Sequence, residues 1–235
     1  MIRNKICVLG SSYIGAVYTA YREHKPATDR FTFDFYGHSH GGFSNVDIVD
    51  DHVQQVRFRS RKPTLPMSTY DAFVVYADLP SPHDISKITS ACAAAGCSAQ
   101  VTEATVRDVV RAKHSYSLYE KLVKSTERPV FLISCNVVSI TQQKLSDERY
   151  KKNTELILKS LDPGVYIPFP DELFGENYAP RREYYNGSVL LTGQKAAEGE
   201  SGHDNHHMNE TGGWLVLKAI VERLDEAFAG RKAAD

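Results

Sequence analysis

Residues 5–12 read Lys5-Ile6-Cys7-Val8-Leu9-Gly10-Ser11-Ser12, a largely apolar run that ends at a glycine. A helical stretch from about Ile14 to Glu23 follows almost at once. Consecutive apolar residues are typical of a strand that is buried on both faces of a parallel sheet. A strand that passes directly into a helix is also how a βαβ unit begins. This stretch therefore predicts an α/β fold with a parallel sheet.

The rest of the chain continues the alternation of strands and helices. Further strands are predicted at Arg30–Phe35, Asp71–Ala77, Pro129–Cys135 and Val165–Ile167, with a short edge strand at Val53–Phe58. Helices are predicted at Ile85–Ala95, Thr102–Ser125 and Asp147–Leu161, and a last helix begins at Asn209, a good N-cap residue. We expect a three-layer, flavodoxin-like parallel sheet with helices on both faces. Residues 1–229 are predicted to form one domain, and residues 230–235 a frayed tail.

Composition argues against several classes of partner. The net charge is −1, so no positive field is present to hold a nucleic acid or an anionic membrane. No apolar run approaches the roughly 18 residues of a membrane span, and the N-terminal apolar run is too short for a signal peptide. The cysteines, which have no common zinc-ligand spacing, are Cys7, Cys92, Cys97 and Cys135. We expect a cytoplasmic protein with reduced thiols.

Ligands of parallel sheets bind at the carboxyl ends of the strands. The turn at that end of the first strand, Gly10-Ser11-Ser12, lacks the middle glycine of a dinucleotide-binding turn and the lysine of a phosphate-binding loop. Of the three motifs, the turn agrees best with the nucleophile motif G-x-S-x-G, although Ile14 replaces the second glycine of that motif. A serine at a helix start also has oriented backbone amides beside it.

A serine nucleophile needs a base, and the end of the chain offers one. In Asp204-Asn205-His206-His207, the carboxylate of Asp204 and the imidazole of His207 are three residues apart, so one turn can bring them together. A histidine held by a carboxylate is the usual base for a serine hydroxyl. The pattern predicts Ser12 as nucleophile, His207 as base and Asp204 as its acid partner.

These two motifs resemble those of the SGNH/GDSL hydrolase superfamily, and in their order and spacing the resemblance covers nearly the whole chain. It implies a serine in a G-x-S turn after the first strand and a D-x-x-H motif before the last helix. It also implies an oxyanion hole made by the backbone of Ser12 and by Gly41, or its neighbour Gly42, after the second strand. The asparagine that the family carries after the third strand is absent from Ala77–Ser81. Asn136, after the fourth predicted strand, is a candidate substitute.

Structural alternatives remain open for each of these residues. Ser12, or more readily Ser11, can cap the following helix, and Asp204 with His207 can be a buried structural pair. Asp78 can be an ordinary exposed carboxylate at a strand end. A metal site is a further alternative, and its candidate ligands are His38, His40, His203, His206, His207 and Asp204. Their spacing matches no common zinc motif, so we expect no metal and no cofactor.

The resulting prediction is a serine ester hydrolase with a Ser-His-Asp triad. The family resemblance implies a small acyl ester as substrate, including carbohydrate O-acetyl esters. The balanced charge predicts no nucleic acid or membrane as partner. An O-acyltransferase with the same triad and a binding module that has lost catalysis are the alternatives. The sequence selects neither among the esters nor among oligomeric states.

Overall fold

The structure is a computed structural model that describes residues 3–24, 30–38, 40–57, 63–134, 144–185 and 207–232. Its main sheet has five strands, all paired in parallel, in the order β2-β1-β6-β7-β8. The strands are β1 (Asn4–Ser11), β2 (Phe31–His38), β6 (Ala72–Leu79), β7 (Val130–Ser134) and β8 (Tyr166–Ile167). Counted along the chain, this is the order 2-1-3-4-5 of flavodoxin-like sheets. The predicted three-layer α/β fold is confirmed.

The alternation of side chains along β1 explains the layers. Ile6 and Val8 belong to one apolar cluster, whereas Cys7 and Leu9 belong to a second one, and all four side chains are fully buried. Successive residues of a strand point to opposite faces, so each cluster fills the space under a different set of helices. The apolar run in the sequence thus reflects burial on both faces.

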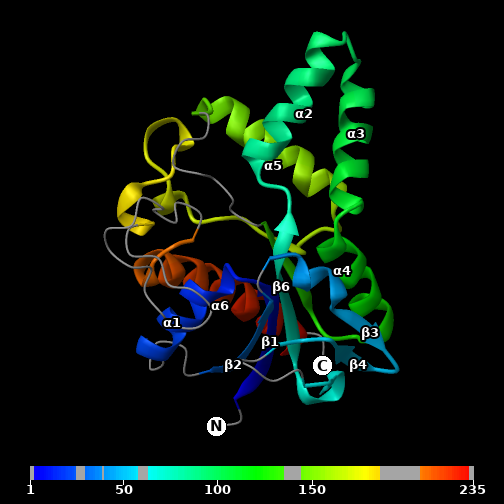
Figure 1. Cartoon of the computed structure of the whole chain (residues 1–235), viewed down its shortest axis with the longest axis vertical. Coiled ribbons are helices and arrows are strands. Elements are labelled where there is room, and N and C mark those ends of the chain that lie inside the picture. The colour runs from blue at the N-terminus through cyan, green and yellow to red at the C-terminus, as the bar shows by residue number, and fades with distance from the viewer. Residues whose placement is uncertain are drawn as a thin grey trace.

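Helices cover both faces of the sheet (Figure 1). The first cluster packs under α1 (Ile14–Glu23) and α6 (Glu210–Lys232), and the second packs under α4 (His114–Ser125). The pair α2 (Pro82–Ala94) and α3 (Ala99–Arg111) extends from the carboxyl end of β6, and α5 (Asp147–Ser160) packs against both helices. Helix α1 has the bounds that the sequence predicted.

The single helix predicted for Thr102–Ser125 is wrong, because the structure has two helices, α3 and α4, in this region. The carboxylate of Asp78, at the end of β6, accepts hydrogen bonds from the backbone N–H groups of His114 (3.2 Å) and Ser115 (2.9 Å). These are donors of the first turn of α4, which have no partner inside a helix. A distant carboxylate therefore starts a new helix. Helix α3 is capped by Ser98, whose Oγ accepts from the N–H of Val101 at 3.3 Å, and not by Thr102.

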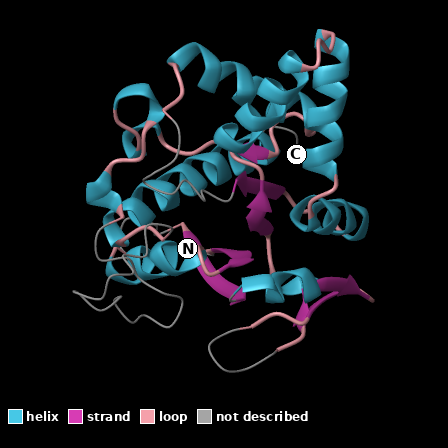
Figure 2. Ribbon diagram, turned by 45° about the horizontal axis from the view of Figure 1, so that its top comes forward, coloured by secondary structure: helices cyan, strands magenta, loops and turns pink. Residues whose placement is uncertain are grey.

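The strand predicted at Val53–Phe58 belongs to a second sheet. This small antiparallel sheet contains β3 (Asp47–Val49), β4 (His52–Gln54) and β5 (Leu65–Pro66), and it forms a separate group of strands in Figure 2. Asp50 and Asp51 join β3 to β4 with φ angles of 47° and 58°. Two such residues match the twist of an antiparallel hairpin. Residue 58 lies outside the described residues.

The end of the chain is anchored by α6. Asn209 caps this helix as predicted, since its Oδ1 accepts from the N–H of Gly212 at 3.0 Å. The helix continues to Lys232, further than predicted, and residues 233–235 of the expected tail lie outside the described residues. Across the described ranges, the structure contains no helix whose length and apolar character would suit a membrane span.

Candidate active site

The strand order places a topological switch point at the carboxyl ends of β1 and β6. The chain leaves β1 toward β2 on one side, and later strands continue on the other, so the connections diverge between β1 and β6. The turn Ser12–Tyr13 at this point joins β1 to α1. A Cβ atom on Gly10 would lie 2.3 Å from Ile14 Cγ2 and 2.4 Å from the Tyr76 carbonyl oxygen. Gly10 is therefore needed for α1 to start so close to β6.

Ser12 and His207 meet at this switch point although 195 positions separate them in the sequence. The distance from His207 Nε2 to Ser12 Oγ is 2.7 Å, a short hydrogen bond. His207 lies just before α6, and Ser12 lies just before α1. The two predicted motifs are thus joined through the side chains that carry the chemistry.

Neither serine of the turn caps α1. The N-cap position belongs to Tyr13, and among the described residues no side chain caps this helix. The Ser11 hydroxyl is buried, and no described residue forms a hydrogen bond with it. The interpretation of Ser12 or Ser11 as a helix cap is therefore wrong.

The ring of Tyr13 packs against the imidazole of His207. The two rings are stacked, with the ring centroids 4.9 Å apart and the planes inclined by 26°. Stacked aromatic rings attract each other and limit each other's rotation. Tyr13 was missed by the sequence analysis. An aromatic residue beside the serine was visible there, but its contact with residue 207 was not.

The segment after His207 is fixed by its backbone and by close helix packing. Asn209 donates its N–H to the Tyr184 carbonyl oxygen at 2.7 Å and its Nδ2–H to the Glu183 carbonyl oxygen at 2.6 Å. A Cβ on Gly213 would lie 2.3 Å from the carbonyl oxygen of Ala16, so α6 touches the backbone of α1. The helix that follows the histidine is therefore locked against the helix that follows the serine.

Hydrogen bonds hold the end of β6 and the loop that follows it in place. The carboxylate of Asp78 accepts hydrogen bonds from the first turn of α4, which gives it a structural role. Ser134, at the end of β7, donates from Oγ to the Pro80 carbonyl oxygen at 2.9 Å, and its Oγ is 2.8 Å from the hydroxyl of Tyr166. Burial raises the pKa of Tyr166 to about 12. Because the only hydroxyl proton of Ser134 is donated to Pro80, the Tyr166 hydroxyl is the donor to Ser134. Buried hydrogen bonds thus fix the segment that follows β6.

The remaining predicted site residues are Gly41, Asp204 and Asn136. Gly41 lies in the 3₁₀ helix His40–Asn45, which directly follows β2, and the last residue of that strand, His38, pairs with Ser11 in the register of the sheet. Asp204 and Asn136 lie outside the described residues.

The histidines considered for a metal site have other surroundings. His38 donates from Nε2 to the carbonyl oxygen of Gln55, and a Cβ on Gly42 would lie 2.7 Å from its Nδ1. His207 contacts Ser12, while His203 and His206 lie outside the described residues. In the ranges that the structure describes, no three His, Cys, Asp or Glu side chains gather as metal ligands would. These contacts assign His38 a structural role.

Comparisons with protein families and with curated proteins find no match for this chain. Among solved structures, a lipase named Lip_vut3, from a goat rumen metagenome, is similar with a TM-score of 0.45 and 10% sequence identity. The similarity covers 94% of this chain and 97% of that one. A likeness of this strength does not bear on the reaction or the substrate. The fold rests on the strand order of the chain itself.

Proposed function

We propose that this protein is a serine-dependent ester hydrolase of the SGNH/GDSL type, with Ser12 as nucleophile and His207 as general base. The observation that carries the proposal is the 2.7 Å contact between Ser12 Oγ and His207 Nε2 at the switch point of the sheet. A serine hydroxyl becomes a nucleophile when a neighbouring base takes its proton. The absence of a cap role for Ser12 supports the same interpretation, because its hydroxyl is directed to the base.

The proposed reaction begins with the proton on Nδ1 of His207 and the Ser12 hydroxyl donating to Nε2. Ser12 Oγ attacks the ester carbonyl carbon while Nε2 takes the proton. Nε2 then returns this proton to the departing alcohol, which leaves an acyl group on Ser12. Water, activated by the same imidazole, releases the acid and restores the serine. Asp204 is the proposed partner of Nδ1, and it would stabilise the imidazolium that forms in each half of the reaction.

The negative charge on the carbonyl oxygen needs hydrogen-bond donors. We assign these to the backbone N–H groups of Ser12 and Gly41, with Asn136 as the alternative side-chain donor. Ser12 precedes the first turn of α1, and the amides of a helix start favour a developing negative charge. The proposed substrates are esters of small acyl groups, including carbohydrate O-acetyl esters.

A fluorophosphonate probe tests the proposal, because it phosphonylates only serines that have an active base. We expect the adduct on Ser12 by tandem mass spectrometry, no labelling of Ser12→Ala, and slow labelling of His207→Ala. Ser81→Ala is the matched control, since it removes the serine that precedes the next helix, and it should label like the wild type. An adduct on another serine overturns the assignment of Ser12, and the absence of any adduct overturns the proposal and favours a binding module.

A second measurement separates hydrolase from acyltransferase. The protein is given a short-chain ester together with an excess of an acceptor alcohol, and the products are quantified. We expect free carboxylic acid as the main product. Predominant transfer of the acyl group to the acceptor would instead assign an acyltransferase with the same residues.

A further inference from the structure

The turn between α2 and α3 brings two cysteines together. Two backbone hydrogen bonds close the end of α2, from Gly96 N to the Ala93 carbonyl oxygen (3.1 Å) and from Cys97 N to the Cys92 carbonyl oxygen (2.9 Å). Gly96 has a φ of 69°, in the left-handed region that glycine adopts without strain. This is the Schellman motif. The side chains of the two residues joined by its second hydrogen bond, which spans five positions, frequently pack against each other. Here these side chains are the thiols of Cys92 and Cys97.

Both residues are free thiols, and they differ in accessibility. Cys92 is 8% exposed, whereas Cys97 is half-buried. A disulfide requires Cα atoms within about 4.4–6.8 Å of each other. A direct backbone hydrogen bond between the two residues holds their backbones within this reach. We therefore expect the bond to close by rotation of the two side chains, without movement of a helix.

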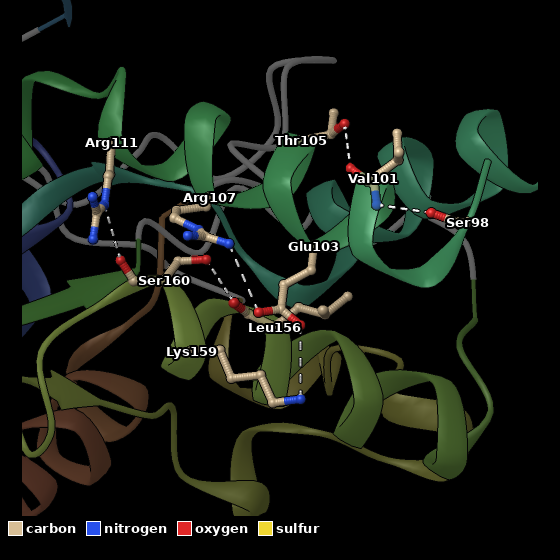
Figure 3. Close-up of polar contacts among 9 residues, drawn as sticks. All are labelled: Ser98, Val101, Glu103, Thr105, Arg107, Arg111, Leu156, Lys159 and Ser160. Carbon is tan, nitrogen blue, oxygen red and sulfur yellow. Dashed lines mark hydrogen bonds and ion pairs between the residues drawn. The ribbon is translucent and has the colours of Figure 1, made fainter.

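A cavity gives reagents access to Cys97. Its volume is about 410 Å³, and it lies where α2, α3 and α5 meet. Cys97 forms part of the wall, together with Ala93 of α2 and Leu156 of α5. Glu103 of α3 and Lys159 of α5 also line the cavity, and Figure 3 shows their contact (4.0 Å) together with the contact of Glu103 with Arg107 of its own helix (3.8 Å). The contact of Glu103 with Lys159 joins α3 to α5 at this wall of the cavity.

We propose that Cys92 and Cys97 form a modification site, a dithiol that closes to an intramolecular disulfide by exchange with a low-molecular-weight disulfide. The accessible Cys97 thiolate attacks one sulfur of the small disulfide, forming a mixed disulfide and releasing one small thiolate. Cys92, after losing its proton, then attacks the Cys97 sulfur and releases the second small thiolate. Two protein thiols are oxidised and one small disulfide is reduced to two thiols, so the electrons balance.

The electrostatics favour the closed form once it exists. Burial, with the neighbouring Cys92 thiol, raises the pKa of Cys97 above its ordinary value, so the thiolate is not stabilised in the reduced pair. Strongly oxidising dithiols are those whose reduced thiolate is stabilised, and this pair is the opposite case. Because the thiolate is the attacking species, closure should be slow near pH 7 and about tenfold faster for each pH unit above it.

The test uses the full chain with oxidised glutathione as the probe. Both cysteines lie in one tryptic peptide, residues 88–107, so the pair is followed in a single species. After reduction, we expect two iodoacetamide adducts on this peptide. After oxidised glutathione, we expect no adduct and a mass lower by two hydrogens. The peptide that carries the fully buried Cys7 should be unchanged in the folded protein.

Serine variants separate the two roles. In Cys92→Ser, Cys97 should accumulate one glutathione, because the second step has lost its thiol. In Cys97→Ser, Cys92 should stay unmodified over the same time. A wild-type peptide that retains two alkylatable thiols in excess oxidised glutathione, or that stops at the mixed disulfide, overturns the proposal.

Discussion

Ser12 and Ser81 lie at equivalent places in two neighbouring units, each between a buried parallel strand and the helix that follows it, yet their hydroxyls have different partners. Ser81 forms a complete capping box with Asp84. Its Oγ accepts from the Asp84 N–H at 3.3 Å and donates to Asp84 Oδ2 at 2.8 Å, while its own N–H donates to the same carboxylate at 3.1 Å. Ser12 instead contacts His207, which is 195 residues away.

The difference separates local stabilisation from assembly of a site. A helix cap contributes about 0.5–2 kcal/mol, and α1 forgoes this contribution from Ser12. Helix α1 is stabilised instead by its packing on α6, where Gly213 allows direct contact with the backbone of Ala16. A serine whose hydroxyl is directed to a distant base is therefore distinguishable, within one fold, from a serine that caps its own helix.

The largest effect should be on turnover when each serine is replaced. Ser12→Ala should lower kcat for a short-chain ester by at least about 10³-fold, because the hydroxyl that becomes acylated is gone. Ser81→Ala, the matched control, should leave kcat unchanged. Steady-state kinetics with both purified variants measures the contrast. Equal losses in the two variants would show that the two serines do not differ as proposed.

The second largest effect on kcat should come from the backbone N–H groups proposed as oxyanion donors. A side chain at Gly41 should displace the local amide, so Gly41→Ala should lower kcat by about 10²–10³-fold with a modest change in KM. Asn136→Ala should have little effect if the amides carry the oxyanion. Circular dichroism checks that both variants fold. The reverse result would assign the oxyanion contact to Asn136 and leave the roles of Ser12 and His207 unaffected.

Tyr13 should contribute a smaller effect through the orientation of His207. Removing the stacked ring in Tyr13→Leu should lower kcat about tenfold, a loss of about 1.4 kcal/mol in the transition state, with little change in KM. Tyr13→Phe retains the ring and should restore most of the rate. Kinetics of the two variants provide the test. If Leu and Phe behave alike, the stacking does not position the base.

The smallest effect concerns stability and not turnover. Ser81→Ala should reduce the free energy of unfolding by about 1 kcal/mol, because the first turn of α2 loses its cap. Ser12→Ala should change it by less than about 0.5 kcal/mol, since no cap is lost. Urea denaturation followed by circular dichroism measures both values. A larger loss of stability for Ser12→Ala would indicate a structural role for its hydroxyl.

The elements predicted from the sequence were those whose signals are local. The run Lys5–Leu9 and the helix Ile14–Glu23 were recognised from apolar patterning, and Asn209 from its place before an apolar helix. The sequence analysis missed the break between α3 and α4 at Lys113. The carboxylate of Asp78, which accepts hydrogen bonds from the first turn of α4, is 35 residues away from this break. Local periodicity continues across that break, so a pattern of apolar residues has no means of detecting it.

By itself, the sequence determined the class of fold, the order of its main strands and helices, and the pairing of a serine motif with a histidine motif as a hypothesis. These follow from periodicity and from residue types at fixed spacing. Only the tertiary structure decided that Ser12 Oγ lies 2.7 Å from His207 Nε2, that Tyr13 stacks on the imidazole, and that Ser81 is the capping serine. The physical reason is distance along the chain. Contacts between residues almost 200 positions apart depend on how the helices pack on the sheet, and close packing is a property of the folded whole.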